Sequence, residues 1–222
     1  MSLITVERKV LESNNAIAEE NRLVLHGKKI FSINMVSSPG SGKTSIIEKT
    51  VLNLKDKVNI GFIVGDLQTS LDAERIDKLG IPSVQIVTNG ACHLDASLVR
   101  NAYKELSNLD IDFLIIENVG NLVCTAEYDL GEHLKVVVSS VTEGDDKPLK
   151  YPIIFRKSMA LILNKIDLLP YLTGSIDVLR TNALSVNPKL QVFETSCISG
   201  VGIDEWCNWL LRQIAFSKDN IP

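Results

Sequence analysis

The sequence predicts an α/β fold of three layers, in which a mostly parallel sheet of about seven strands is flanked by helices. Short apolar runs of strand length alternate with segments of helical periodicity along most of the 222-residue chain. This alternation is typical of a parallel sheet with helices on both faces. Polar motifs directly follow several of the apolar runs. Because ligands of such sheets bind at the carboxyl ends of the strands, the same pattern predicts where the functional site lies.

The individual elements follow from the spacing of apolar residues. Strands are expected at residues 30–36, 58–64, 84–87, 111–116, 136–138, 161–163 and 191–193. Helices are expected at 44–54, 72–79, 94–106, 175–186 and 203–214, and a further helix at 3–21 would make residues 1–29 an N-terminal helical extension. Because no repeat, low-complexity tract or linker interrupts the pattern, residues 1–222 are expected to form one domain.

The composition argues against several classes of protein. Apolar residues make up 45% of the chain, which indicates a globular fold. No apolar run reaches the roughly 18 residues of a membrane span, and no secretory signal is expected at the N-terminus. A formal net charge of −4 argues against nucleic acid as a partner. Four sparse cysteines are typical of reduced thiols, so a cytoplasmic location is expected.

A glycine-rich segment after the first predicted strand predicts a phosphate-binding P-loop, and with it the fold of the P-loop NTPases. It reads Ser37-Ser38-Pro39-Gly40-Ser41-Gly42-Lys43-Thr44 and continues into Ser45. Backbone N–H groups of such a loop point at phosphate oxygens, and the helix N-terminus adds positive potential. Lys43 is expected to bridge the β- and γ-phosphates, and Thr44 to ligate Mg²⁺. Ser37 stands where the pattern usually has glycine, so the start of the loop is expected to differ slightly.

A second motif predicts that the nucleotide is GTP or GDP. The expected guanine contacts are Asn164, Lys165, Asp167, Ser196 and Cys197. The first three belong to an Asn-Lys-Ile-Asp segment that resembles the Asn-Lys-x-Asp signature of GTPases. Asp167 would accept hydrogen bonds from guanine N1–H and from the N2 amino group, a donor pair that adenine lacks. Asn164 would contact the N7/O6 edge, and the last two residues are expected near a backbone donor for guanine O6.

Acidic residues at two neighbouring strand ends predict the rest of the Mg²⁺ site. Glu117-Asn118-Val119-Gly120 resembles the Asp-x-x-Gly switch II element of GTPases, with Glu in place of Asp. Glu117 would act directly or through a metal-bound water, and the N–H of Gly120 would sense the γ-phosphate. Asp66 and Asp72 are candidates for switch I, although Asp72 is equally suited to cap its helix. The expected catalytic residues are Lys43, Asp66 and Glu117.

Two cysteines and a histidine indicate a possible second site. Cys92 and His93 precede the predicted helix at 94–106, and Cys124 lies four residues after Gly120. Both segments can emerge at the same edge of a parallel sheet, and two thiolates with an imidazole suit Zn²⁺ or Ni²⁺. By spacing alone the pattern is weak, because a free cysteine is commonly a small core residue and a lone histidine a satisfied polar group.

Five segments together resemble the HypB family of hydrogenase maturation GTPases. They are residues 36–44, 65–69 (Gly-Asp-Leu-Gln-Thr), 91–96 (Ala-Cys-His-Leu-Asp-Ala), 115–124 (Ile-Ile-Glu-Asn-Val-Gly-Asn-Leu-Val-Cys) and 143–147 (Glu-Gly-Asp-Asp-Lys). The resemblance implies a SIMIBI-class GTPase, a GTP-dependent homodimer, and Ni²⁺ or Zn²⁺ bound by Cys92, His93 and Cys124 at or near the dimer interface. It also implies nickel delivery to a [NiFe]-hydrogenase large-subunit precursor with a HypA-type nickel/zinc protein.

The spacing further predicts how the two sites communicate. Residues 117–120 would respond to the γ-phosphate, and Cys124 lies on the same short segment, so movement of the switch would alter metal coordination. Hydrolysis is expected to be slow, because neither an arginine finger nor a water-orienting glutamine is apparent. Lys147 and Lys150 either reach a nucleotide across a dimer or are simply exposed lysines.

Three alternatives remain open at this point. The urease accessory GTPase UreG also pairs a P-loop with nickel, but it typically carries Cys-Pro-His, whereas Cys92 and His93 are adjacent here and Cys124 is separate. A non-enzymatic guanine-nucleotide switch would use GTP binding alone to drive assembly. A signalling GTPase would use the cysteines only as structural residues.

Overall fold

The computed structural model describes residues 6–66 and 75–219. Its sheet consists of β1 (Phe31–Ser37), β2 (Ile60–Asp66), β3 (Ser83–Val87), β4 (Phe113–Glu117), β5 (Leu134–Ser140), β6 (Ala160–Asn164) and β7 (Gln191–Glu194). The order across the sheet is β3-β2-β4-β1-β5-β6-β7, and every neighbouring pair is parallel. The predicted α/β architecture with seven strands is therefore confirmed.

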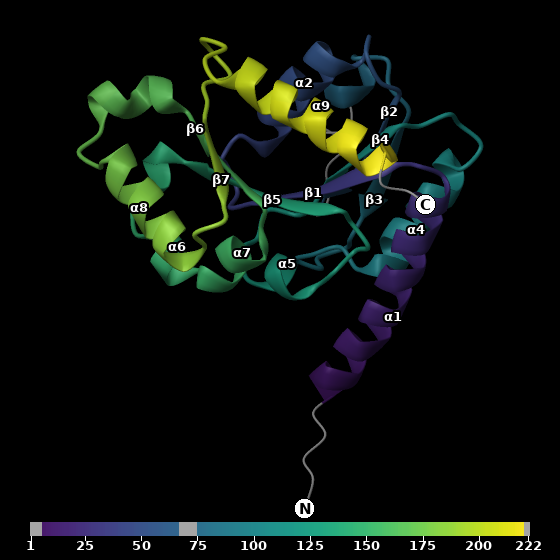
Figure 1. The fold of residues 1–222 in the computed structure, drawn as a ribbon. Coiled ribbons are helices and arrows are strands. Elements are labelled where there is room, and N and C mark those ends of the chain that lie inside the picture. The colour runs from purple at the N-terminus through teal and green to yellow at the C-terminus, as the bar shows by residue number, and fades with distance from the viewer. Residues whose placement is uncertain (1–5, 67–74, 220–222) are drawn as a thin grey trace, which may run out of the picture.

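Helices cover both faces of the sheet (Figure 1). On one face lie α2 (Lys43–Leu54) and α9 (Ile203–Asp219), which pack against each other and against β1. On the other face lie α4 (Ala96–Leu106), α5 (Cys124–Glu127), α6 (Lys147–Lys150), α7 (Pro152–Lys157) and α8 (Ile176–Val186). Two short 3₁₀ helices, η1 (Val141–Glu143) and η2 (Ile166–Tyr171), follow β5 and β6.

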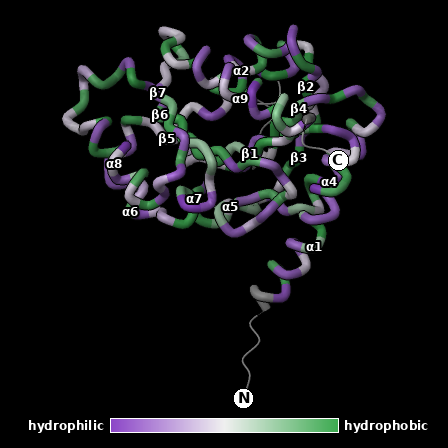
Figure 2. The backbone as a smooth tube through the Cα atoms, in the orientation of Figure 1, coloured by the Kyte–Doolittle hydropathy of each residue, from purple (hydrophilic) through white to green (hydrophobic). Residues whose placement is uncertain are grey.

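The core divides into three apolar clusters because successive strand side chains point to opposite faces. One large cluster, which includes Ile33, Met35 and Trp206, lies between the sheet and α2 and α9. The opposite face carries two separate clusters. One packs Ile116 against α4 (the α4 cluster), and the other packs Val137 against α7 and α8 (the α7–α8 cluster). Figure 2 shows hydrophobic segments along the central strands.

Helix α1 (Val6–Gly27) confirms the predicted N-terminal helix and continues six residues beyond its predicted end at residue 21. It lies beside α4, and its first turns extend beyond the body of the protein (Figure 1). Ala18 is fully buried, whereas Val10 is 47% exposed, so apolar contacts account for only part of the packing of α1. Two buried asparagines, Asn14 and Asn21, hydrogen-bond instead to the backbone at the start of α4 and of the loop before β5. Backbone groups at that place need polar partners, and apolar periodicity does not reveal such contacts.

The remaining predicted elements agree with the structure to within a few residues. The predicted helix at 72–79 lies partly outside the described residues; residues 75–77 are helical, and Gly80 has the positive φ (+74°) of the predicted C-cap. The helix predicted at 94–106 begins at Ala96, because the Asp95 side chain caps it by accepting from Leu98 N at 2.8 Å. The short helices α5, α6, α7, η1 and η2 were not predicted, since six residues or fewer carry no clear periodicity. Among the described residues no helix combines the length and apolarity needed to cross a membrane.

Candidate functional site

Strand β1 leads the chain into the predicted phosphate loop. All residues of β1 are buried, and the chain then turns at Gly40 (φ +77°) and Gly42 (φ +92°) before α2 begins at Lys43. Such φ values favour glycine. Ser37, however, is the last residue of β1 and is absent from the described residues with positive φ. A serine therefore fits there without backbone strain, and the altered loop start that the sequence suggested is not required.

The loop borders a cavity of about 530 Å³. Its lining consists of residues 37–45, Gly65, Arg75, residues 117–120 and Lys165. The predicted P-loop and the predicted switch II segment therefore face the same space. Gly120 packs so closely on the loop that a Cβ there would lie 3.2 Å from the backbone nitrogen of Pro39, which explains why a glycine occupies this position.

A buried glutamate joins the loop to β4. Lys43 Nζ donates to Glu117 Oε1 at 2.6 Å, and the Thr44 hydroxyl donates to the same oxygen at 2.7 Å. Glu117 is 1% exposed, and its other oxygen, Oε2, is buried without a hydrogen-bond partner among the described residues. Desolvating a carboxylate oxygen in this way is costly unless a ligand satisfies it. The three residues thus converge as the sequence predicted, paired with one another.

The predicted guanine motif contacts the loop from the end of β6. Asn164, at the end of β6, donates from Nδ2 to Ser41 O at 3.0 Å, and Lys165 Nζ donates to Gly40 O at 2.7 Å. The contact with Gly42 is tight, since a Cβ on that glycine would lie 2.4 Å from Asn164 Nδ2. These contacts bring the two predicted nucleotide motifs together although more than a hundred residues separate them.

The rest of the guanine set lies beside Asn164. The side-chain oxygen of Asn164, Oδ1, accepts from the Thr195 hydroxyl at 3.3 Å and contacts Cys197 Sγ at 3.7 Å. The Ser196 N–H already donates to Val201 O at 3.0 Å. In this segment the Cys197 N–H is therefore the better candidate to donate to guanine. Asp167 lies in the first turn of η2, directly after these contacts.

The two predicted switch I acids are less fully described. Asp66 ends β2, beside β4; its backbone is described but its side chain is not. The register pairs Val64 with Glu117, so the ends of β2 and β4 are adjacent as predicted. Asp72 lies outside the described residues.

Two residues of the cavity wall and its support were missed from the sequence. Arg75 lines the cavity, and its guanidinium contacts Glu48 at 2.6 Å and Ser45 Oγ at 3.1 Å. Glu143 accepts from the Ser41 hydroxyl at 2.6 Å and pairs with Lys147 Nζ at 2.9 Å. Both approach the loop from distant segments and belong to no recognised motif. The Glu143 stretch did form part of the family resemblance, but no role for Glu143 followed from it.

Of the two lysines left open by the sequence, only Lys150 is exposed. Lys147 is largely buried against Glu143, whereas Lys150 pairs with Asp146 on the surface at 2.6 Å. Both lysines are therefore paired with acids of the segment 143–146.

The predicted thiol–histidine set comes together at one place. Cys92 Sγ lies 2.8 Å from Cys124 Sγ and 3.7 Å from His93 Nδ1, and all three ligand atoms lie within 4.8 Å of one another. Cys124 opens α5, whose N-terminus is held by Asn121 Oδ1, which accepts from Cys124 N at 3.0 Å. The ring of His93 stacks on Tyr128 with centroids 3.8 Å apart.

The protonation of this cluster follows from its surroundings. The contact with Cys92, and then burial, raises the pKa of the Cys124 thiol. Burial lowers the pKa of the His93 imidazole, with Asp95 acting in the opposite sense. A lowered pKa favours the neutral imidazole, which is the form that binds a metal, whereas a metal would have to displace the Cys124 proton. For the two thiols outside the cluster burial is the main cause, and it raises the pKa of Cys197 to about 11 and that of Cys207 to about 12.

The parallel sheet and the phosphate loop at the start of α2 place the chain among the P-loop nucleotide-binding proteins. Residues 32–194 match the family described as CobW/HypB/UreG, nucleotide-binding domain. The chain is 48% identical over 211 residues to the hydrogenase maturation factor HypB of Escherichia coli strain K12, an alignment that covers 95% of this chain and 73% of that protein. The chain belongs to the HypB family of hydrogenase maturation factors.

Two solved structures support this assignment. HypB from Archaeoglobus fulgidus superimposes with a TM-score of 0.86 at 37% identity, covering 91% of this chain and 99% of that one. HypB from Helicobacter pylori in complex with nickel gives a TM-score of 0.87 at 36% identity, covering 94% and 97%. These similarities favour the hydrogenase interpretation over the UreG alternative.

Proposed function

We propose that the protein is a GTP-hydrolysing metallochaperone in which the nucleotide state controls a bound Ni²⁺ or Zn²⁺. GTP or GDP would bind beside the P-loop, and the metal would bind at Cys92, His93 and Cys124. The observation that carries the proposal is that one short segment serves both places. Glu117 contacts the phosphate loop, and Cys124, seven residues later in the chain, lies in the thiol cluster.

The internal pairing of the loop supports a switch that operates by exchange of partners. Lys43 is now neutralised by Glu117. A phosphate would offer the ammonium a second anion, in line with the N–H groups at the start of α2. Glu117 would then be released from its present contact, and the chain that follows it, including Gly120, would respond. Lys43 would also stabilise the charge that develops on the phosphates during hydrolysis.

The same corner suits Mg²⁺. Thr44 Oγ1 and the buried Glu117 carboxylate present hard oxygen ligands. Oε2 of Glu117, which has no hydrogen-bond partner among the residues the structure describes, leaves a site for a cation. Asp66 at the adjacent strand end, and Asp72, are further candidates to hold the ion. When bound, Mg²⁺ would supply neutralisation of charge on the β- and γ-phosphates.

Hydrolysis in this proposal is slow without a partner. Arg75 lines the cavity, but its guanidinium contacts Glu48 and Ser45 and so is already engaged. Lys147 is engaged by Glu143. A GTP-dependent homodimer, with the metal at or near its interface, is part of the proposal, and Lys147 or Lys150 would have to leave its acidic partner to reach across it.

Nickel would be the cargo of the protein rather than a resident cofactor. Two thiols and one imidazole, all half-buried, make a compact set that leaves coordination positions for a partner's ligands. The proposed partners are a HypA-type nickel/zinc protein and a [NiFe]-hydrogenase large-subunit precursor, and the proposed setting is the cytoplasm, where thiols stay reduced. The related protein from Helicobacter pylori was solved in complex with nickel, which supports the choice of metal.

Two measurements on the purified full chain test the proposal. Multiple-turnover phosphate release from GTP, with ATP as the competing substrate, should be selective for GTP and should be lost in Lys43→Ala. Single-turnover behaviour or GTP binding without release would indicate a non-enzymatic switch instead. Stoichiometric Ni²⁺ or Zn²⁺ binding should be lost in Cys92→Ala, and its persistence there would leave a signalling GTPase with structural cysteines.

A further inference from the structure

Four buried polar side chains form a continuous series of contacts beneath the switch II segment. They are Asn118, Asn34, Glu132 and Lys135, and together we call them the buried relay. Their exposed fractions are 0%, 0%, 8% and 7%. None is a predicted site residue, and none lines the nucleotide cavity except Asn118.

The position of the relay in the sheet is unusual. Asn34 alternates along β1 with Ile33 and Met35, so it points to the face that carries the α4 and α7–α8 clusters. The register places Asn34 opposite Ile116 on one side and opposite Lys135 on the other. Polar residues therefore interrupt the apolar cover in the middle of this face. Burying them is costly unless each is satisfied.

One end of the relay connects the switch with the metal loop. The Asn118 side-chain oxygen accepts from Leu94 N at 3.0 Å and from its neighbour Val119 N at 3.0 Å. Leu94 directly follows His93, and Asn118 directly follows Glu117. The Asn118 side chain therefore connects the segment that follows Glu117 with the segment that follows His93, a predicted metal ligand.

The series continues from Asn118 to the middle of the sheet. Asn118 Nδ2 donates to Asn34 Oδ1 at 3.3 Å, and Asn34 Nδ2 donates to Glu132 Oε1 at 3.1 Å. Lys135 Nζ lies 3.4 Å from the same glutamate oxygen. Glu132 Oε2 accepts in addition from Leu130 N at 2.8 Å. Every member has a partner, so the series is a satisfied network of the kind that specifies one arrangement.

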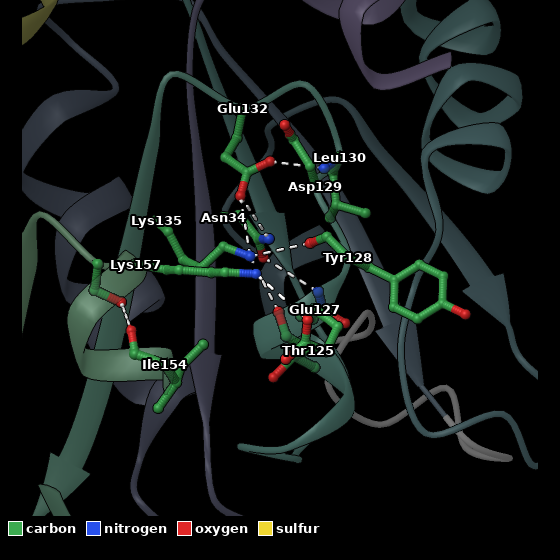
Figure 3. Close-up of polar contacts among 12 residues, drawn as sticks. Asn34, Thr125, Glu127, Tyr128, Asp129, Leu130, Glu132, Lys135, Ile154 and Lys157 are labelled. Atoms are coloured by element: carbon green, nitrogen blue, oxygen red, sulfur yellow. Dashed lines mark hydrogen bonds and ion pairs between the residues drawn. The ribbon is translucent and has the colours of Figure 1, made fainter. Parts of the chain in front are cut away.

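The other end of the relay holds the helix that carries Cys124. Lys135 Nζ donates to Thr125 O and to Tyr128 O, each at 3.0 Å (Figure 3). Thr125 directly follows Cys124, and the Tyr128 ring stacks on His93. One ammonium group therefore fixes both ends of the single turn α5, and with them the neighbourhood of two of the three predicted metal ligands.

We propose that Asn118 and Lys135 are positioning residues that transmit the nucleotide state to Cys92, His93 and Cys124 through the buried relay. The inference rests on the proposed function. It adds a route through buried side chains to the route along the backbone from Glu117 to Cys124. When Glu117 changes partners, the Asn118 backbone moves with it. Its amide then shifts Leu94 at one end and, through Asn34 and Glu132, Lys135 at the other.

A matched pair of lysines makes this testable, because both contact α5. Lys135 is buried and binds backbone carbonyls, whereas Lys157 is 46% exposed and only approaches Glu127, at 3.6 Å (Figure 3). Ni²⁺ affinity, followed by the thiolate-to-nickel charge-transfer absorption, is measured for the full chain with GDP and with a non-hydrolysable GTP analogue. The ratio of the higher to the lower Ni²⁺ affinity in the two nucleotide states should be the same for wild type and for Lys157→Met. In Lys135→Met that ratio should fall toward 1.

A second readout, free of metal, separates this inference from the proposed function. Amide hydrogen exchange of the segments 91–96 and 124–128 should differ between the two nucleotide states in wild type and in Lys157→Met, and this difference should vanish in Lys135→Met. If wild type binds no nickel while the exchange result holds, the proposed function fails and the relay stands. If Lys135→Met keeps both the wild-type ratio and the wild-type exchange difference, the relay is overturned. Should Lys135→Met not fold, Glu132→Gln, which keeps the shape and removes the charge, is expected to lower the same ratio, and an unchanged ratio there overturns the inference equally.

Discussion

The phosphate cavity and the thiol cluster lie on neighbouring loops but are built differently. Around the cavity the charged and amide side chains are already paired within the chain, as in the contacts of Lys43 with Glu117 and of Lys165 with Gly40 O. In the cluster the three ligand atoms mainly contact one another. A nucleotide must therefore displace existing partners, whereas a metal needs mainly to displace protons.

This difference favours a direction for the proposed coupling, from the nucleotide site to the thiol cluster. In the proposed function, displacing Glu117 from Lys43 would free a buried acid and move the chain around it, so the nucleotide site would be the source of motion. The thiol cluster has few internal restraints of its own and is positioned by Asn121, Asn118 and Lys135 from outside. Metal affinity depends steeply on ligand geometry, so the cluster is suited to respond to that motion.

The largest effect is expected from removing both thiols of the cluster. The double variant Cys92→Ala/Cys124→Ala should weaken Ni²⁺ binding on the order of 1000-fold, because two of three ligands are lost. GDP affinity should stay at the wild-type value, since neither thiol reaches the cavity. Isothermal titration with each ligand measures both. Cys207→Ala, which removes a thiol from the core, is the matched control and should retain the metal; loss of metal there would mean that cysteine content, not the cluster, matters.

A smaller but still large effect is expected on the other site from Asp167→Asn. Replacing the carboxylate removes charge-assisted hydrogen bonds to guanine, so GDP affinity should fall by roughly 100-fold. Xanthosine diphosphate, whose C2 oxygen suits the new amide, should bind the variant better than GDP does. Displacement of a fluorescent GDP analogue measures this preference. Unchanged GDP affinity would show that Asp167 does not contact the base.

An intermediate effect on GDP binding is expected from Gly42→Ala, which adds a methyl group where the P-loop packs against Asn164. Gly42→Ala places a Cβ 2.4 Å from Asn164 Nδ2 at a residue with φ +92°. The strain should lower the free energy of unfolding by about 1–2 kcal/mol and weaken GDP binding by roughly 10-fold. Thermal unfolding and GDP titration report the two effects. Gly174→Ala, where a Cβ would meet nothing within 4 Å, should change neither, and an equal loss in both variants would refute the explanation.

The smallest effect is expected where α1 is attached to the body. Burial raises the pKa of Asp129, but the N–H of Gly131 and the guanidinium of Arg22 outweigh it and hold that pKa below its usual value. A lowered folded-state pKa gives stability that is present above the unfolded value and is lost as pH falls through the folded one. Asp129→Asn should therefore destabilise the protein by about 1 kcal/mol at pH 7, and by progressively less below about pH 4.

Denaturant unfolding at several pH values measures this difference. Asp177→Asn removes an exposed acid that pairs with Arg180 on the surface of α8 and serves as the control. It should cost a few tenths of a kcal/mol at most. A loss for Asp129→Asn that is independent of pH would show that the ion pair is not its cause.

The sequence predicted the fold and the main site because both have periodic or motif signals. Strands alternating with helices predicted the sheet, and the carboxyl ends of those strands predicted where residues 37–44, 117–120 and 164–167 would meet. Ligand type indicated the grouping of Cys92, His93 and Cys124 only weakly, and the resemblance to the HypB family implied it. These predictions rely on local sequence alone, and the structure brings each set together.

The missed residues share a different property. Asn14 and Asn21 on α1 and Glu143 are polar side chains that contact backbone or loop groups far away in the chain. Lys135 in β5 contacts carbonyl groups of a nearer segment, at Thr125 and Tyr128. An isolated polar residue inside an apolar run reads as an exception to the pattern, and no rule of spacing names its partner. Such contacts depend on the three-dimensional register, which pairs Asn34 with Lys135 only once β1 and β5 are adjacent.

The central claim is that the phosphate site sets the geometry of the thiol cluster. It is tested most directly by Ni²⁺ titration of the wild-type chain saturated either with GDP or with a non-hydrolysable GTP analogue, at one pH and one protein concentration. The proposed coupling predicts affinities that differ by at least about fivefold, the lower range of measured couplings between sites. Identical affinities in the two nucleotide states would contradict it.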